Sequence, residues 1–469
     1  MTETTLNAQH TFDQLPPIWP TSLLAEIRAI HKQSGKRLVI LDDDPTGTQT
    51  VHGVPLLTEW SVKSLRNELK QSNVFFVLTN SRSLPEEEAV ALALEIGQNL
   101  LQAAELAGVT YTVLSRSDST LRGHFPAEVD ALCQGMGRTY DATIMVPYFK
   151  AGGRYTLNNI HYVQQGEQLV PASQTEFADD KAFPFTHSFL PKYVEEKTKG
   201  RIKSDQVYGL SLQTIREGGP PAVKAALVQI PKGAVIIINA ADDRDIEVAV
   251  KGIYLAQASG KAYIYRTAAS FVRVLAGIEE RPLLHAQNMA TPTSNGGILF
   301  VGSHIQKSTA QLRKALAIPN VFPVEIDVEK LLNEEWRAST IAQNLSQITA
   351  ALESGQHVVA FTSRKLIASP SASTSLAISR VISNSMCEMV RRLKVQPRFL
   401  IAKGGITSND IATKGLQVKR ALIAGQLQPG VPVWILGAES KFPGMHYVVY
   451  PGNVGSENGL AEALLAFDK

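Results

Sequence analysis

The chain has 469 residues, of which 44% are hydrophobic and 19% charged, which is enough for two or three domains with buried cores. The net charge of +3 is too near neutral for a nucleic-acid-binding surface, and two cysteines, Cys133 and Cys387, exclude a disulfide framework and suit a reducing compartment. No apolar run reaches the roughly 20 residues of a membrane span, and the first twenty residues lack the pattern of a signal peptide. We therefore expect a soluble cytoplasmic enzyme whose partners are neither nucleic acid nor membrane.

Short apolar segments alternate with helical patterns along the first half of the chain, and their near-continuous apolar character is typical of parallel strands buried on both faces. A helix is predicted between the second and third strands. In it Ser83 and Glu86 form a capping box, Pro85 lies just inside the start, and Gly108 ends it. The alternation predicts an α/β fold with mainly parallel sheets. The predicted strands are 37–42, 74–79, 111–114, 142–146 and 234–239.

The pattern starts again after a small, polar and turn-rich stretch at 286–296, which we expect to be a linker. It would separate a first domain at 37–285, preceded by an N-terminal extension at 1–36, from a second domain at 297–469. Residues 165–191 contain three prolines and are expected to form a long loop or an active-site flap. The strands predicted in the second half are 298–302, 357–362, 398–402, 432–436 and 446–450.

In open α/β sheets ligands bind beyond the carboxyl ends of the strands, so the residues after each strand are the first candidates for a site. The first strand runs into Asp42, Asp43 and Asp44, with Thr46 in the following turn. Carboxylates there can hold Mg²⁺ or accept a proton from a substrate hydroxyl. A solvated turn with a helix cap is the alternative interpretation.

The next three predicted strands run into cationic side chains. Arg82 follows the second strand, Arg116, Asp118 and Arg122 follow the third, and Arg154 follows the fourth beside a glycine pair. Guanidinium groups bind carboxylates or phosphates through paired hydrogen bonds, and this mixture suits a polar substrate with an anionic end. A surface arginine, a helix-capping loop and a mobile loop are the respective alternatives.

The second half carries glycine-rich turns at three strand ends, which together point to a nucleotide. The first strand runs into VGSHIQKST, where Gln306 stands in place of the glycine that a P-loop requires before its lysine, so we exclude a P-loop. The histidines show no metal-ligand spacing, and no nucleophile elbow is present. The candidate nucleotide contacts in these turns are Ser303, Gly404, Gly405, Thr407, Gly452 and Gly455.

The ordered motifs DDDPTGTQT, NSRS, SRSDSTLRGH, GGRYT, VGSHIQKST, KGGITSND and PGNVG resemble those of the four-carbon acid sugar kinase family, and DSTLRG at 118–123 is the most specific of them. The resemblance spans about residues 37 to 465. It implies an N-terminal domain for the sugar acid, a C-terminal domain for ATP, an active site in the cleft between them, and phosphorylation of a tetronic acid or its 3-oxo form at the terminal hydroxyl. ATP and Mg²⁺ are the implied cofactors, and a homodimer is a reasonable expectation.

Carried over motif by motif, the resemblance implies that Asp44, Arg82, Arg116, Asp118 and Arg122 face the sugar acid. It likewise implies that ATP is contacted by Ser303, Ser363, Gly404, Gly405, Ile406, Thr407 and the 452–455 turn. Residue types add Asp43, Thr46 and Arg154 to the expected substrate-binding set. In-line phosphoryl transfer needs a group that accepts the hydroxyl proton. We expect this group to be Asp118 or Asp44, and the sequence does not choose between them or name the metal ligands.

Two rival functions remain at this stage. Asp42, Asp44 and Thr46 fit the D-x-D-x-T start of haloacid-dehalogenase-type phosphatases, with Asp42 as the nucleophile, and Asp242 and Asp243 resemble their late acidic pair. This interpretation leaves DSTLRG and the glycine turns unexplained. A nucleotide-gated sugar-acid sensor without catalysis is the other rival, favoured only by Ile406 standing where the family commonly has an acid.

Overall fold

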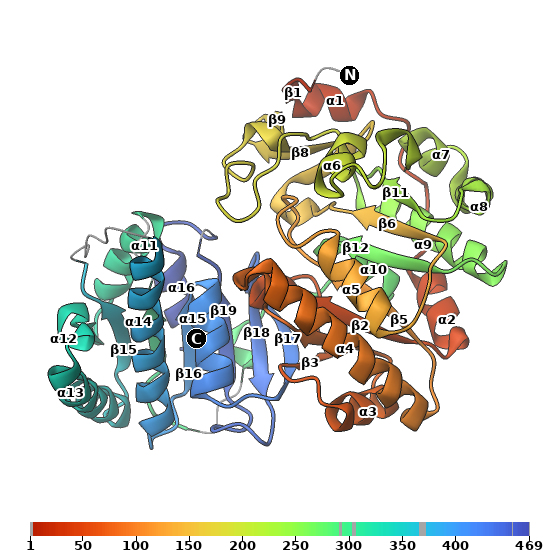
Figure 1. Cartoon of the computed structure of the whole chain (residues 1–469). Helices are drawn as coiled ribbons and strands as arrows, with labels where there is room; N and C mark the ends of the chain where they lie inside the picture. The colour runs from red at the N-terminus through yellow and green to blue at the C-terminus, as the bar shows by residue number, and fades with distance from the viewer. Residues whose placement is uncertain (1–2, 290–292, 303–305, 365–371, 453, 469) are drawn as a thin grey trace. The chain divides into compact units, whose positions relative to one another are not determined.

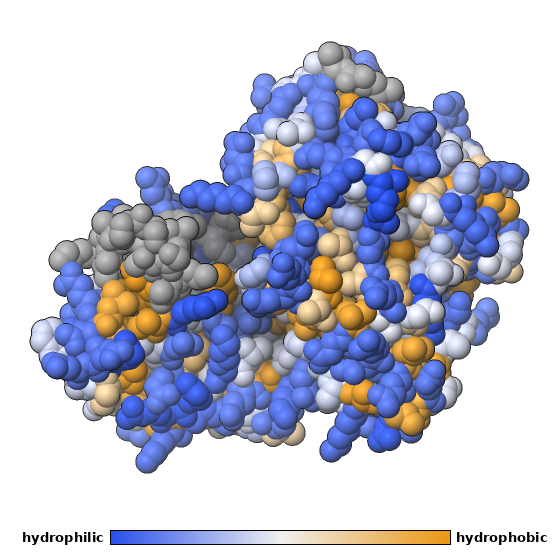
Figure 2. Space-filling model, in the orientation of Figure 1, coloured by the Kyte–Doolittle hydropathy of each residue, from blue (hydrophilic) through white to orange (hydrophobic). Residues whose placement is uncertain are grey.

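The computed structural model describes residues 3–289, 293–302, 306–364, 372–452 and 454–468 (Figure 1). The chain forms two compact units. Unit 1 comprises Met1–Thr50 and Glu59–Glu280, and unit 2 comprises Val51–Thr58 and Arg281–Lys469. Within the described ranges, no helix has the length and apolarity needed to cross a membrane. On the face drawn in Figure 2 hydrophilic residues cover most of the surface, with hydrophobic residues scattered between them.

Unit 1 is built on a sheet of parallel strands in the order β10-β11-β6-β12-β5-β2-β4. A small antiparallel sheet, in the order β1-β9-β8-β7, accompanies it. The strands of the large sheet are β2 (Arg37–Asp42), β4 (Val74–Leu78), β5 (Tyr111–Arg116), β6 (Ala142–Val146), β10 (Val207–Leu210), β11 (Ala234–Ile238) and β12 (Tyr263–Thr267). Those of the small sheet are β1 (Leu6–Asn7), β7 (Arg154–Leu157), β8 (Ile160–Gln165) and β9 (Gln168–Pro171).

Helices cover the sheet of unit 1, because its strands are apolar on both faces. One group consists of α3, α4 and α5, with α4 packed between the other two, and another gathers α2, α8 and α10 around α9 (Figure 1). The helices of this unit are α1 (Ala8–Asp13), α2 (Leu24–Ser34), α3 (Val62–Gln71), α4 (Glu86–Ala107), α5 (Ala127–Gly135), α6 (Leu190–Lys197), α7 (Leu212–Arg216), α8 (Gly219–Gln229), α9 (Asp243–Ala258) and α10 (Ala269–Leu275).

Unit 2 has a mixed sheet in the order β3-β17-β18-β19-β16-β13-β15-β14, antiparallel from β3 to β19 and parallel from β19 to β14. Pro323 lies in the edge strand β14, where a missing N–H is tolerated. The strands are β3 (Val54–Leu57), β13 (Ile298–Val301), β14 (Val321–Ile326), β15 (His357–Thr362), β16 (Phe399–Lys403), β17 (Arg420–Gln428), β18 (Val431–Leu436) and β19 (His446–Tyr450).

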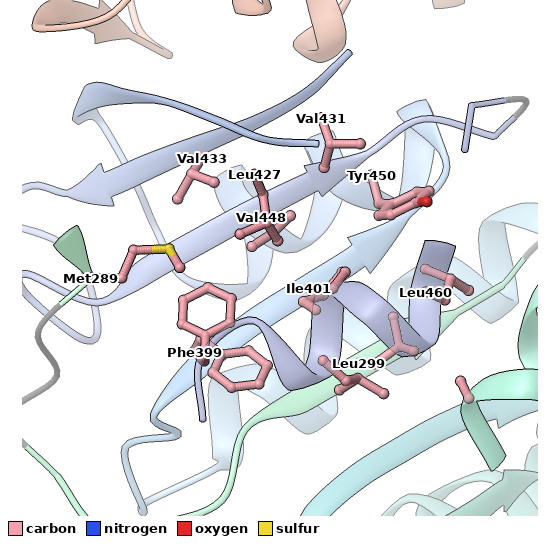
Figure 3. Packing of buried hydrophobic residues seen from close by; sticks show 14 of the residues in the cluster. Met289, Leu299, Phe399, Ile401, Leu427, Val431, Val433, Val448, Tyr450 and Leu460 are labelled. Carbon is pink, nitrogen blue, oxygen red and sulfur yellow. The ribbon is translucent and has the colours of Figure 1, made fainter. Parts of the chain in front are cut away.

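The core of unit 2 joins its parallel strands to two of its helices. Figure 3 shows Leu299, Phe399, Ile401 and Val448 of the strands facing Leu460 of α16. The helices are α11 (Gln306–Leu316), α12 (Val328–Leu332), α13 (Glu334–Glu353), α14 (Ala372–Arg392), α15 (Gly405–Asp410) and α16 (Gly459–Leu465). Helix α11 packs on α16, and α13 packs on α12 and α14.

The predicted α/β class with mainly parallel sheets is confirmed, and each predicted strand is present within two residues of its expected bounds. The capping box was wrong. Pro85 is the N-cap of α4, two residues after the expected N-cap Ser83, whose hydroxyl donates to the Asn80 carbonyl at 2.8 Å within the preceding 3₁₀ turn. Gly108 ends the helix in a left-handed conformation, as predicted.

The expected domain limits at 37–285 and 297–469, and the expected linker at 286–296, remain predictions. The compact units divide the chain after Glu280 and place residues 51–58 in unit 2, where β3 pairs with β17. The sequence pattern gave no reason to remove these eight residues from the first half. The expected N-terminal extension 1–36 lies in unit 1, with β1 paired to β9.

Candidate active site

The strand ends of unit 1 bring the predicted acidic and basic residues together, because β2 lies between β4 and β5. Asp42 at the end of β2 pairs with Arg116 at the end of β5, with 3.0 Å between Oδ1 and Nη1. Burial raises the pKa of Asp42 to about 7, although Arg116 opposes the shift. The Pro45–Thr48 turn lies directly against the Asp42–Arg116 pair, because a Cβ added to Gly47 would lie 2.0 Å from Asp42 Oδ2. Asp42 and Arg116 therefore support the site from beneath, and direct contact of Arg116 with a substrate remains a prediction.

Arg82 joins the two aspartates that we expected to be catalytic. Its Nη2 pairs with Asp44 Oδ2, and its Nη1 lies 3.3 Å from Asp118 Oδ1. Burial, the largest single effect, would raise both pKa values, but Arg82 together with Thr46 at Asp44, and Arg82 together with Arg122 and Thr120 at Asp118, outweigh it. The pKa of each aspartate is consequently held below its ordinary value. Both are ionised at neutral pH and can accept a hydrogen bond from a substrate hydroxyl.

Thr46 and Asp43 belong to the same cluster. The backbone N–H of Thr46 donates to Asp44 Oδ1 at 2.8 Å, and its hydroxyl donates to the same oxygen, so Thr46 orients Asp44. Asp43 accepts from the Ser117 hydroxyl and lies 3.8 Å from Arg82 Nη2. Its Oδ1 is buried and accepts no hydrogen bond from the residues that the structure describes.

Arg122 and Arg154 form the cationic side of the site. Arg122 Nε donates to Asp118 Oδ2 at 2.7 Å. Burial lowers the pKa of Arg154, and its buried Nε finds no acceptor within the described part of the chain. The guanidinium carbons of Arg122 and Arg154 lie 5.1 Å and 5.5 Å from the centre of the Phe177 ring. An anionic ligand would satisfy these two cations.

Sequence reasoning missed several residues of this cluster. Arg266 reaches it from β12 and donates to the Arg122 carbonyl at 2.9 Å. Glu128 of α5 accepts from the Ser81 hydroxyl, and burial raises the pKa of Glu128 to about 7. The short apolar run 262–265 could have revealed β12, since a turn-forming Ser-Gly pair lies shortly before it. Nothing in the sequence marks Glu128, which lies among ordinary helix formers.

His161 supports the loop that carries Asp118 and Arg122. Its Nε2 lies 2.7 Å from the Ser119 carbonyl, which only accepts, so Nε2 carries the proton and Nδ1 accepts from the Thr156 hydroxyl at 3.0 Å. Burial lowers the pKa of His161 to about 4, so the ring stays neutral and fixes the loop. The geometry of His161 therefore fits a structural role.

The predicted glycine turn after β16 forms the start of α15. Gly404 is its N-cap with φ of +108°, and its own N–H donates to the Tyr450 carbonyl at 2.8 Å. No described side chain caps the first N–H groups of this helix. The side chain of Ile406 is 60% exposed, so it points into solvent and does not cover these N–H groups. A Cβ on Gly302 would lie 3.2 Å from Thr407 Oγ1, so the ends of β13 and β16 are adjacent. These backbone donors, with Gly405 at the first helical position, form the strongest anion-binding candidate in unit 2.

The turn after β19 is pinned to the same strand ends by Lys403. Lys403 is fully buried, and its Nζ donates to the carbonyls of Pro451 and Gly452 at 2.7 and 2.9 Å. Burial lowers the pKa of Lys403 to about 7. Gly455 has φ of +84°, and a Cβ there would lie 2.2 Å from the Tyr450 hydroxyl. Gly452 thus lies beside the end of β16, and Gly455 lies against Tyr450 at the end of β19.

The remaining two candidates have different outcomes. Ser303 lies outside the described residues. Ser363 follows β15, and its hydroxyl oxygen accepts the Val328 N–H at 3.1 Å, which fixes the start of α12. Any contact of either serine with a nucleotide stays a prediction.

A metal site is not preformed in the parts of the chain that the structure describes, since no group of three or more His, Cys, Asp or Glu side chains is arranged to hold an ion. The phosphatase alternative fares poorly on geometry. Asp42, its nucleophile, is fully buried in the pair with Arg116. Of its late acidic pair, Asp242 caps α9 and binds Lys150 at 2.8 Å, and Asp243 binds Arg273 at 2.7 Å.

Two family models match the chain. Residues 38–275 match a sugar-binding N-terminal domain, and residues 298–460 match a nucleotide-binding C-terminal domain. Solved structures of proteins from Haemophilus influenzae and Salmonella typhimurium share the fold. Their TM-scores are 0.63 and 0.66 at 20% and 18% identity, covering 92% and 91% of this chain and 100% and 98% of theirs.

Three curated relatives are similar over long stretches. A 3-oxo-tetronate kinase of Methylobacterium radiotolerans is 26% identical over 90% of this chain and 97% of its own length. A D-threonate kinase of Bordetella bronchiseptica is 23% identical over 85% of this chain and 87% of its own. A D-erythronate kinase of Heliobacterium modesticaldum is 25% identical over 66% of each chain.

Proposed function

The chain belongs to the four-carbon acid sugar kinase family, and on that premise we propose that it transfers the γ-phosphoryl group of ATP to the terminal hydroxyl of a four-carbon sugar acid. The observation that carries this proposal is the cluster in unit 1, where Arg82 holds two ionised aspartates beside the cations Arg122 and Arg154. Such a cluster offers both a carboxylate receptor and a proton acceptor. D-erythronate, D-threonate and 3-oxo-tetronate, the acids in the relatives' names, all match this chemistry.

The substrate carboxylate would bind Arg154 and Arg122. Arg154 has a buried donor to offer, and Arg122 presents its Nη2 while its Nε is held by Asp118 and its Nη1 by Asp180. Guanidinium–carboxylate pairs fix both position and orientation. Because phosphoryl transfer is catalysed mainly by positioning and charge stabilisation, holding the acid end directs the opposite hydroxyl toward the phosphate.

The proton of that hydroxyl would pass to Asp118 or Asp44. Both carboxylates are ionised at neutral pH, since Arg82 lowers their pKa values against the effect of burial. Thr46 orients Asp44, and Thr120 donates to Asp118. A carboxylate that accepts a proton as the new bond forms contributes about 10²–10⁴-fold to a rate.

ATP supplies the phosphoryl group, and the uncapped N–H groups at Gly405 and Ile406 would hold its phosphates. Gly452 and Gly455 would shape the wall beside them. Mg²⁺ usually binds nucleotide phosphates together with one or two protein carboxylates and waters. The buried Asp43 Oδ1, which accepts no hydrogen bond from the described residues, fits such a role.

The test is a coupled assay of ADP release with Mg·ATP against D- and L-threonate, D-erythronate and their 3-oxo forms. We expect ADP release with at least one acid and a product heavier by one phosphoryl group. Binding of ATP and an acid without ADP release would instead support a sensor. Release of phosphate from a phosphorylated acid without ATP would support the phosphatase. A cytoplasmic location and a homodimer remain expectations for such an enzyme.

A further inference from the structure

A structured segment covers the cationic side of the sugar-acid site. This β9–α6 segment, residues 172–189, follows β9 and precedes α6. The Glu3 carboxylate ties its two ends together, because it accepts the N–H groups of Ser188 and Phe189 at 3.0 and 2.7 Å and the Ser173 hydroxyl at 2.8 Å. The segment is therefore anchored at both ends.

The middle of the segment is docked on the loop that carries Arg122. Asp180 uses one oxygen to accept the N–H groups of Ala182 and Phe183 at 2.9 and 3.2 Å. Its other oxygen lies 3.4 Å from Arg122 Nη1. The Phe183 ring meets the His124 ring edge-on, 4.8 Å between centres. The hydrogen bonds to Asp180, together with the Glu3 anchor at both ends, hold the backbone on either side of Phe177, and none of them uses the Phe183 ring.

Phe177 is the residue of the segment that meets both cations. Its ring centre lies 5.1 Å from the guanidinium carbon of Arg122 and 5.5 Å from that of Arg154, within the range in which a ring face attracts a cation. A carboxylate bound to these two arginines lies beside the ring. The carbon chain attached to that carboxylate then meets a rigid wall instead of solvent.

We propose that Phe177 is a specificity-determining residue that limits the length of the sugar acid. This inference rests on the proposed function and adds a chain-length determinant to it. A shorter side chain at 177 would open space next to the carboxylate-binding arginines, so five-carbon sugar acids would gain room. A pocket that excludes one additional carbon typically discriminates by about 10–200-fold.

The experiment compares kcat/KM for four-carbon and five-carbon sugar acids in the wild type, Phe177→Ala, Phe177→Leu and Phe183→Ala. Phe183→Ala is the matched control, because Phe183 lies in the same segment and contacts His124. We expect Phe177→Ala to raise the five-carbon to four-carbon ratio by about 10-fold or more. Phe177→Leu should raise it less, and Phe183→Ala should leave it within twofold of the wild type.

An unchanged ratio in a folded Phe177→Ala protein that still phosphorylates a four-carbon acid would overturn the inference, and so would an equal shift in Phe183→Ala. If Phe177→Ala does not fold, Phe177→Leu decides by the same ratio. Absence of ADP release by the wild type with every acid would refute the proposed function itself, which is a separate outcome.

Discussion

The two candidate sites of this chain are built from different chemistry. In unit 1 the site consists of charged side chains, with Arg82 bridging Asp44 and Asp118. In unit 2 it consists of backbone groups, with open N–H donors after Gly404 and carbonyls held by Lys403. A sugar acid differs from its analogues in the placement of hydroxyls and charge, which side chains can discriminate. Phosphates are alike in every nucleotide, and a backbone cradle is sufficient for them.

This difference predicts how each site fails. A side-chain site loses chemistry when one functional group changes and the backbone stays in place. A backbone site is insensitive to most side-chain changes but sensitive to any Cβ that alters a turn. The following predictions test that contrast from the largest expected effect to the smallest.

Replacing both aspartates, Asp44→Asn with Asp118→Asn, should lower kcat by about 10²–10⁴-fold, because no carboxylate then accepts the hydroxyl proton. Steady-state ADP release measures the effect. Asp242→Asn is the matched control. Asp242 lies at another strand end, where it caps α9 and pairs with Lys150. The kcat of this control variant should stay near that of the wild type. Unchanged turnover in the double variant would remove both aspartates from the mechanism.

Gly404→Ala should raise the KM for ATP by about 10-fold or more, because φ of +108° strains any residue with a Cβ and displaces the N–H donors. Gly444→Ala provides the comparison. Gly444 also has a positive φ, +76°, but it precedes β19 at the end opposite the glycine turns. Both variants should lose stability, whereas only Gly404→Ala should change the KM for ATP. An equal change in the two would argue against a backbone-built nucleotide site.

Arg82→Gln should move the acidic limb of the kcat/KM profile to higher pH. Arg82 opposes the effect of burial on Asp44 and Asp118 and holds their pKa values down, so its removal raises both values. Activity that requires the ionised form is then lost earlier as the pH falls. Arg201→Gln, which breaks the exposed pair with Asp130, should leave the profile in place. A profile unmoved by Arg82→Gln would show that neither aspartate controls that limb.

The smallest effect is expected for Glu3→Gln, which weakens the anchor of the β9–α6 segment. Hydrogen bonds from Ser188 and Phe189 outweigh burial and lower the pKa of Glu3. Its stabilising effect is therefore present above the ordinary pKa of glutamate and is lost as the pH falls through the lowered value. We expect the KM for the sugar acid to rise by about 2–5-fold at neutral pH, which is less than the full loss of a charge-assisted hydrogen bond, because Glu3 acts on the site only through the segment. Glu26→Gln, which breaks an exposed pair with Lys251, should have no such effect, and an equal rise there would contradict the anchor.

The sequence was informative where local chemistry determines structure. Buried parallel strands appear as apolar runs, and the residues after them, such as Asp44 and Arg82, meet because neighbouring strands end at one edge. It was uninformative where distant segments meet. Nothing local indicates that Glu3 anchors residue 188, that Phe177 covers Arg122, or that residues 51–58 join unit 2. The capping box of α4 was wrong because Ser83 belongs to the turn that precedes the helix, which begins only at Glu86.

In this account the sugar acid is assigned to side chains in unit 1 and the nucleotide to backbone groups in unit 2. The most direct test of this assignment is calorimetric titration of one sugar acid and of a non-hydrolysable ATP analogue into three proteins. These are the wild type, Arg154→Gln and Gly404→Ala. The account predicts that Arg154→Gln weakens the acid about 10-fold or more and leaves the nucleotide within twofold, since it removes a charged hydrogen bond to the carboxylate. It predicts the reverse for Gly404→Ala. If either substitution weakened both ligands equally, the assignment of the acid to side chains in unit 1 and of the nucleotide to backbone in unit 2 would be contradicted.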